Sequence, residues 1–322
     1  MTISAKKIEH SISPQGIELK TALARYPRFI HAEELTHRIL SSTPDMIIEI
    51  NDGLMYDRNL SRNASSSRAI PVQRLIDDIM RDTAMPISWG KNQRGMQAGE
   101  EHNATVIMFD DFGSPLNYTR EEAWLWARDR AIQAAMAYDQ AGYHKQIVNR
   151  ILEPFAHINV LITATDWDNF FELRDHKDAQ PEIQLLAKAI KAAFEGSEPE
   201  LLLPGQWHLP FVTDHEREWL ELETQKKISV ARCARTSYLT HEGKAPLISK
   251  DLTLYADLVG ARPLHASPAE HQATPDTFVP GHVGPYGEYR VDRYQSPELH
   301  GNLRGWNQNR KFIERNIFAE AA

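Results

Sequence analysis

The chain has 322 residues, of which 42% are hydrophobic and 25% charged, the proportions of an ordinary globular protein. Its net charge of −8 argues against a general nucleic-acid-binding surface, because binding to a phosphate backbone needs a surplus of Lys and Arg. Cys233 is its one cysteine, so no intrachain disulfide is possible, and residues 1–20 lack the apolar stretch of a signal peptide. No apolar run suits a membrane span, so we expect a cytoplasmic protein without nucleic-acid or membrane partners.

Apolar periodicity and turn residues predict the regular elements along the first part of the chain. Thr119 and Glu122 have the spacing of a capping box, so we expect a long helix from there to about Gln140. The elements expected before it are a strand over residues 17–26, a helix over 29–40, a hairpin in an inserted segment over 41–60, an amphipathic helix over 71–81 and a loop over 84–99.

The second part of the chain mixes one apolar strand with several helices. The β-branched stretch 157–165 predicts a buried strand, and Asp166 is placed to cap a helix over 167–175. Pro181 suits the first turn of another helix, which ends at Phe194. The elements expected beyond it are a linker over 196–210, a helix over 215–227, an apolar segment over 228–234, a helix over 250–259 and a loop over 275–297. The predicted class is α+β.

The segment 61–68 has the composition of a phosphate site. It combines four serines, one asparagine and two arginines. Arginine matches phosphate oxygens in a bidentate fashion, and serine adds short hydrogen bonds. Taken alone, the segment is a weak signal, for which a polar surface loop is the ordinary explanation.

The order of these residues resembles the signature of the flavin-dependent thymidylate synthases, which joins R-H-R to S-x-N-E-x-S-x-R. The second half is matched by Ser61, Asn63, Ser66 and Arg68, and the end of the first half by His37 and Arg38. The inserted segment 41–60 lies between the two halves. Thr36 and Ala64 stand where the family has Arg and Glu.

A second resemblance covers residues 169–174, N-F-F-E-L-R, which are similar to the family's N-F-x-x-L-R. Residues 178–183 are similar to its H-A-Q-x-E-I, with Asp178 in place of His. The resemblance implies that Asn169 contacts flavin and that Arg174 contacts the pyrimidine ring and stabilises its deprotonated form. A fixed guanidinium in a dry site favours that negative charge, which makes C5 of the ring nucleophilic. An ion pair between Arg174 and Asp178 on the helix surface is the plain alternative.

Upstream, residues 150–154 resemble an R-x-x-L-P segment whose Arg binds the nucleotide, which implies that role for Arg150. Thr163 and Thr165 occupy the approximate places of an Asn and an Arg that contact flavin in relatives. An ordinary surface ion pair is the alternative for Arg150.

The third resemblance is displaced along the chain. Residues 265–271, H-A-S-P-A-E-H, are similar to the family's H-x-S-P-x-E-H, and residues 234–238, A-R-T-S-Y, to its A-R-x-S-Y. Relatives carry this block before the R-H-R signature, whereas here it follows the other motifs. We interpret this order as a circular permutation of a single catalytic domain, 1–322, in which residues 228–322 resemble the usual N-terminal part.

The resemblance implies a central mixed or antiparallel sheet with flanking helices, and an enzyme that methylates dUMP at C5 to give dTMP. It would use FAD, with NADPH and methylenetetrahydrofolate as co-substrates, and no metal. Relatives are homotetramers with shared sites, so we expect a homo-oligomer that takes small-molecule nucleotide and folate substrates. Nucleotide contacts are implied for Ser66, Ser67, Arg68, Arg150 and Arg174, with Arg174 catalytic, and flavin contacts for His37, Arg38, Asn63, Thr163, Thr165, Asn169 and His271.

Two other functions stay open. The departures at Thr36, Ala64 and Asp178 suit a sister enzyme that leaves a different C5 group, such as hydroxymethyl, on dUMP or dCMP. The second is a flavin- or nucleotide-binding protein without catalysis.

Two other kinds of site are weaker interpretations. His265, Glu270 and His271 could be metal ligands, but their order is not that of a zinc protease motif and Pro268 interrupts a helix. Cys233 lies in an apolar run, where a small buried residue is the ordinary explanation, and the flavin route needs no thiolate.

Overall fold

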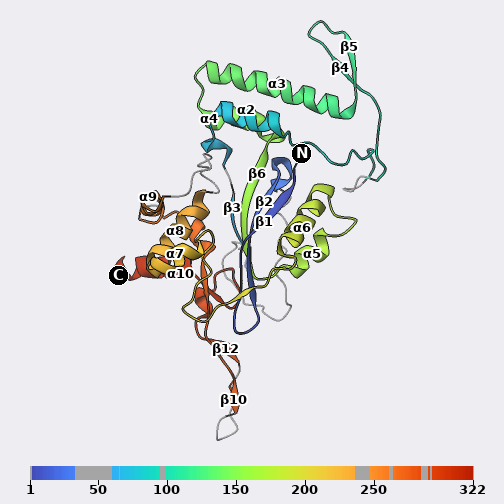
Figure 1. The fold of residues 1–322 in the computed structure, drawn as a ribbon. Coiled ribbons are helices and arrows are strands. Elements are labelled where there is room, and N and C mark those ends of the chain that lie inside the picture. The colour runs from blue at the N-terminus through green and yellow to red at the C-terminus, as the bar shows by residue number, and fades with distance from the viewer. Residues whose placement is uncertain are drawn as a thin grey trace.

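The computed structural model describes residues 2–32, 60–64, 66–94, 99–235, 247–260, 264–283, 289–290 and 292–321. Its main sheet has five strands in the order β3-β6-β2-β1-β7, and every neighbouring pair is antiparallel except β1 and β7 (Figure 1). These strands are β1 (Ser4–Ile12), β2 (Glu18–Pro27), β3 (Leu60–Ala64), β6 (His157–Ala164) and β7 (Glu200–Leu201). The strands predicted over 17–26 and 157–165 are therefore confirmed, and they are neighbours at the centre of a mixed sheet.

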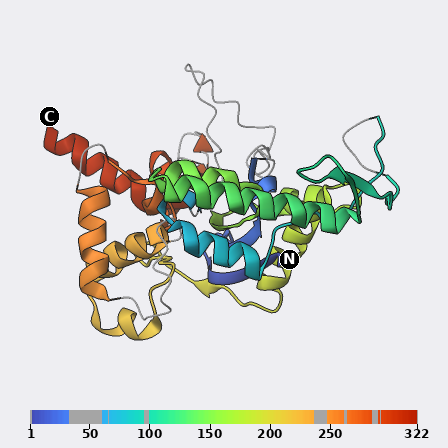
Figure 2. The same cartoon turned by 90° about the horizontal axis from the view of Figure 1, so that it is seen from above.

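Helices flank this sheet on more than one side. Figure 1 shows α5 and α6 on one side and α7 to α10 on the other, and Figure 2 shows α3 lying across α2. The helices are α2 (Val72–Arg81), α3 (Arg120–Gln140), α4 (Lys145–Leu152), α5 (Asp168–Arg174), α6 (Pro181–Phe194), α7 (Asp214–Trp219), α8 (Leu222–Arg235), α9 (Ile248–Val259) and α10 (Asn309–Ala321). Mixed α and β structure around a central sheet agrees with the predicted class.

Short elements connect these layers. A hairpin of β4 and β5 projects past the end of α3 (Figure 1). The remaining strands are β4 (Val106–Phe109), β5 (Pro115–Tyr118), β8 (Ala273–Pro275), β9 (Phe278–Val279), β10 (His282–Val283), β11 (Tyr289–Arg290), β12 (Arg293–Tyr294) and β13 (Trp306–Gln308). The 3₁₀ helices are η1 (Arg28–Ile30), η2 (Ser67–Ala69), η3 (Glu153–Phe155), η4 (Ser267–Glu270) and η5 (Pro297–Leu299).

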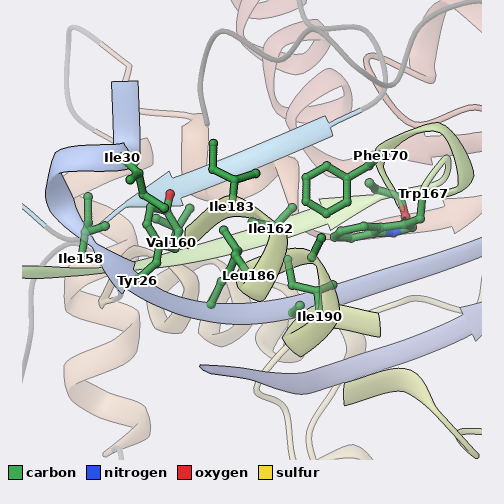
Figure 3. Packing of buried hydrophobic residues seen from close by; sticks show 14 residues of the cluster. Tyr26, Ile30, Ile158, Val160, Ile162, Trp167, Phe170, Ile183, Leu186 and Ile190 are labelled. Atoms are coloured by element: carbon green, nitrogen blue, oxygen red, sulfur yellow. Dashed lines mark hydrogen bonds between the residues drawn. The ribbon is translucent and has the colours of Figure 1, made fainter. Parts of the chain in front are cut away.

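The two faces of β2 and β6 differ in chemistry because successive side chains of a strand point to opposite faces. One face packs apolar side chains against α6, where Ile183, Leu186 and Ile190 recur at helical spacing (Figure 3). Each such buried side chain stabilises the fold by about 1.5–3 kcal/mol. Thr21 and Thr163 alternate with these core residues, so they lie on the opposite face, and both are buried.

Several predicted helices are confirmed with their boundaries. Thr119 accepts a hydrogen bond from the backbone N–H of Glu122 and forms a capping box at the start of α3. α2, α6 and α9 follow the helices predicted over 71–81, from Pro181, and over 250–259. Most of the predicted helix 29–40 and all but the last residue of the inserted segment 41–60 lie outside the described residues. None of the described helices combines the length and the apolar character that crossing a membrane would require.

Other predicted elements are wrong. The linker expected over 196–210 is part of the packed structure: it supplies β7 and buries Trp207, His208 and Leu209. The single helix expected over 215–227 is two helices, α7 and α8, and the second continues through the predicted apolar segment. The loop expected over 275–297 contains short strand pairs.

The predicted cap of the helix after β6 is also wrong. The N-cap of α5 is Trp167, without a side-chain cap bond, whereas the Asp166 carboxylate accepts a hydrogen bond from Arg304 at 2.9 Å. The Asp166 carboxylate, which the local sequence predicted would cap α5, therefore bonds to an arginine from a distant part of the chain.

Candidate functional site

Thr163, near the end of β6, is where the first and the third resembling segments meet. Its Cα partner on one side is Ser61 of β3, the first residue of the S-x-N-x-x-S-x-R match. Its partner on the other side is Thr21, and the two hydroxyl oxygens are 2.7 Å apart. The hydroxyl also bonds to Nδ1 of His271 at 2.8 Å, and η4, the body of the displaced H-x-S-P-x-E-H block, contacts β3. Segments far apart in the sequence are thus joined at one residue.

The backbone around His271 is anchored on two sides. Ala273 exchanges both backbone hydrogen bonds with His208, at 2.8 and 3.3 Å. The Gln272 side-chain amide donates to the Ser229 hydroxyl at 3.1 Å, and the Gln272 backbone carbonyl accepts from the Asn309 backbone N–H at 2.8 Å. These contacts fix the position of the imidazole against the polar face of the sheet.

His271 is a neutral, deeply buried imidazole. It has 0% exposed surface, and burial lowers its pKa to about 3. Its Nε2 has no hydrogen-bond partner in the described part of the chain. A buried polar atom of this kind costs about 1–3 kcal/mol unless a partner satisfies it, so Nε2 is the natural contact point for a ligand.

The Ser66–Arg68 part of the motif forms η2 and lies against α4. Asn149 of α4 donates to the carbonyl oxygens of Ser67 and Ile70 at 2.7 and 2.9 Å. The Ser67 hydroxyl is buried and donates to Glu153 at 2.5 Å. To contact a phosphate, the Ser67 hydroxyl would have to give up its hydrogen bond to Glu153 and donate to the phosphate instead. The assignment of Ser67 to the nucleotide stays a prediction.

Arg68 and Arg150, which we call the arginine pair, are exposed on these two adjoining elements. The Arg68 Nε donates weakly to Ser66 at 3.5 Å. Neither guanidinium forms an ion pair within the residues that the structure describes. The surface ion pair considered for Arg150 is thus not present there, and two uncompensated cations remain available for an anion.

The α5 motif emerges from the same end of β6. Asn169 lies exposed in its first turn, and Arg174, half-buried, is its last residue. Burial lowers the pKa of the Arg174 guanidinium. Downstream, Gln180 caps α6 through the Ile183 N–H at 2.8 Å, which gives this part of the motif a structural role.

The other predicted flavin contacts have different surroundings. The Thr165 hydroxyl is buried and accepts from the Arg304 backbone N–H at 3.3 Å. Asn63 lies in β3 opposite Leu161 of β6. His37 and Arg38 lie outside the described residues.

Thr21 and His208 are polar residues that the sequence did not single out. Nε2 of His208 is 2.7 Å from the Thr21 hydroxyl, and its Nδ1 is 2.9 Å from the Ser11 hydroxyl. His208 is completely buried, and this burial lowers its pKa well below the usual value. The available signal was the Trp207-His208-Leu209 run, an apolar cluster within a Pro- and Gly-containing stretch.

The residues considered as metal ligands or as a thiolate nucleophile have other contacts or surroundings in the structure. Glu270 pairs with Arg310, and His271 bonds to Thr163. Among the described residues, no three His, Cys, Asp or Glu side chains gather as a metal site. Burial raises the pKa of the Cys233 thiol, which disfavours a thiolate nucleophile.

No protein-family model matches the sequence, and no curated protein matches it. Solved structures that resemble the chain include two crystal structures of a UMP/dUMP methylase, PolB, from Streptomyces cacaoi. The one bound with 5-Br UMP has a TM-score of 0.39 and 13% identity, and covers 61% of this chain and 89% of that chain. The one bound with 5-Br dUMP has a TM-score of 0.38 and 12% identity, and covers 61% and 90%. At these values the likeness establishes neither the fold family nor the activity of this chain.

Proposed function

We propose that the chain is a flavin-dependent enzyme that methylates dUMP at C5, with methylenetetrahydrofolate and NADPH as co-substrates. The observation that carries this proposal is the bond between His271 and Thr163. It joins the displaced H-x-S-P-x-E-H block to the strand that pairs with the S-x-N-x-x-S-x-R segment. Such a meeting is what a circular permutation of the family's order requires.

The buried surroundings of Thr163 suit a flavin. The ring of FAD carries carbonyl oxygens and ring nitrogens that accept hydrogen bonds, and Nε2 of His271 is a buried polar atom without a partner among the described residues. His271 would hold the ring, together with Thr163, Thr165 and Asn169. When bound, the flavin supplies the redox chemistry of the reaction.

The nucleotide would be held mainly through the negative charge of its phosphate. The arginine pair would bind the phosphate, because exposed guanidiniums that have no acidic partner in the described part of the chain match its oxygens, and Ser66 lies beside Arg68. Arg174 would contact the pyrimidine and stabilise negative charge on it, provided that water is excluded.

We also propose a homo-oligomer, a tetramer as in the relatives, with small-molecule nucleotide and folate as its binding partners. Electrostatic stabilisation is strong only where water is excluded, yet the arginine pair and Asn169 are exposed in the single chain. A second copy that covers them would provide that exclusion.

The deciding experiment is an assay of the purified chain with dUMP, methylenetetrahydrofolate and NADPH, with and without FAD. The expected product is dTMP, detected by mass spectrometry, with a flavin absorbance spectrum in the protein. Parallel reactions replace dUMP by UMP or dCMP. Modified dCMP beside unchanged dUMP would contradict the proposal and favour the sister enzyme. Flavin binding without any product would favour a non-catalytic binding protein.

A further inference from the structure

Five buried polar side chains form one hydrogen-bonded row, which we call the relay. In order they are Ser11, His208, Thr21, Thr163 and His271. Each has 0% exposed surface. The successive distances are 2.9, 2.7, 2.7 and 2.8 Å, so every link is a well-formed hydrogen bond. His208 and Ser11 belong to segments outside all the resembling motifs.

Proton counting limits the relay to two arrangements. Burial lowers the pKa of both imidazoles, so each is neutral, with one N–H donor and one bare nitrogen. Each hydroxyl has one proton to donate. All four bonds can therefore run from Ser11 towards His271, or all four from His271 towards Ser11, and the two histidine tautomers change together.

The Ser11 end distinguishes these arrangements. In the first, Ser11 donates to Nδ1 of His208, and every proton along the row has an acceptor until Nε2–H of His271. In the second, the Ser11 hydroxyl accepts from His208 and its own proton needs another acceptor, but Ser11 has no second partner in the described part of the chain. The first arrangement leaves one buried group, Nε2–H of His271, without a partner in the described residues. The second leaves two, the Ser11 O–H and the bare Nε2 of His271, and this difference favours the first arrangement.

We propose that Ser11 and His208 are positioning residues that hold His271 in its Nε2–H tautomer through Thr21 and Thr163. His271 then presents a hydrogen-bond donor, and its ligand must offer an acceptor atom at that point. The tautomer follows from the relay alone. That the acceptor belongs to a flavin rests on the proposed function.

The geometry around His208 supports a positioning role. Its backbone is fixed by both bonds to Ala273, two residues after His271, and its ring packs edge-on to Trp306 with centroids 6.5 Å apart. The imidazole has little freedom to turn, so its two nitrogens keep facing Ser11 and Thr21. The two histidines of the relay are therefore held by the same backbone bridge between His208 and Ala273.

The test is the tautomer of His271 in ¹⁵N-histidine-labelled protein without ligand, measured by long-range ¹H–¹⁵N NMR and assigned from the spectra of His271→Gln and His208→Gln. The expected result is protonated Nε2 and bare Nδ1 at both His271 and His208. Protonated Nδ1 at His271 would overturn the proposal, and the tautomer itself is read from the wild-type protein.

The Ser11→Ala variant tests whether Ser11 determines the tautomer of His271 through the intervening hydrogen bonds of the relay. Without the Ser11 hydroxyl, both arrangements leave one imidazole nitrogen unsatisfied at each end, so both histidines should show mixed tautomers. Ser11→Thr should restore the single tautomer. Ser229→Ala is the matched control, because Ser229 is buried and bonds to Gln272, next to His271, but lies outside the relay.

An unchanged His271 tautomer in Ser11→Ala, or the same mixture in Ser229→Ala, would refute the positioning role. Addition of FAD then separates the two proposals. A shift of the His271 Nε2 resonance supports a flavin acceptor. A correct tautomer with no response to FAD leaves the relay standing and contradicts the flavin assignment.

Discussion

Around Thr163, polar side chains are buried and each bonds to the next, whereas the arginine pair lies exposed without ion pairs in the described residues. Both regions hold residues that the motif resemblance assigns to one site. The buried region is already organised by the fold, and its polar groups contribute to stability as well as to any ligand contact. The arginine pair contributes little to the fold, so its chemistry depends on what binds there.

Arg174, the last residue of α5, is intermediate in burial between these two regions. Arg174→Ala should lower turnover of dUMP by about 10²–10³-fold, because it removes a charge that stabilises the reacting ring. Flavin content should stay unchanged, as measured by absorbance of the purified variant. Arg81→Ala, an exposed arginine of α2 paired with Asp78, is the control and should keep full activity. Full activity of Arg174→Ala would remove Arg174 from the catalytic role.

The buried region should be the more sensitive to loss of a hydroxyl. Thr163→Val keeps the shape of the side chain but leaves Nδ1 of His271 without a partner and removes one of the two hydrogen bonds of the Thr21 hydroxyl. The expected loss in free energy of unfolding is about 2–4 kcal/mol, measured by urea denaturation. Arg150→Ala should leave the denaturation midpoint unchanged. Equal stability of the two variants would break the comparison between the regions.

The arginine pair should show the opposite pattern, in binding rather than stability. Arg68→Ala and Arg150→Ala should each weaken dUMP binding by about 10-fold or more, since each removes charge-assisted hydrogen bonds to the phosphate. Calorimetry with deoxyuridine, which lacks the phosphate, supplies the control: its affinity should not change. If both ligands lose affinity equally, the arginine pair does not bind the phosphate.

Local patterns predicted the elements whose burial follows from their own sequence. β2 and β6 have apolar alternation, α3 has its capping box, and α6 begins at Pro181. β1 was missed because its sequence is polar, and it is a strand because β2 and β7 pair with it on either side. Pairing of this kind depends on distant segments, which no local pattern contains.

The site shows the same limit. The motifs named Thr163 and His271 separately, and their contact could be expected only through the permutation. Residues 196–210 looked like a linker because of their Gly and Pro content, yet His208 of this stretch completes the relay. The apolar residues on either side of His208 indicate burial at most, whereas its role depends on bonds to β1, β2 and β8, which the local sequence does not contain.

The buried region should also make the stability of the fold depend on pH, through His271. The pKa of His271 falls from 6.5 to about 3 on burial, so between these values the unfolded chain binds a proton that the folded chain does not. Its contribution to stability is therefore complete above pH 6.5 and is lost as the pH falls towards 3, by up to about 1.4 kcal/mol per pH unit. His271→Gln should flatten the decline in urea-measured stability between pH 6 and 4 by about that slope. His215→Gln, at an exposed histidine of α7, should leave it unchanged. The same decline in wild type and His271→Gln would mean that His271 is already accessible to protons in the folded chain, and the contrast between a closed and an open region would no longer hold at this residue.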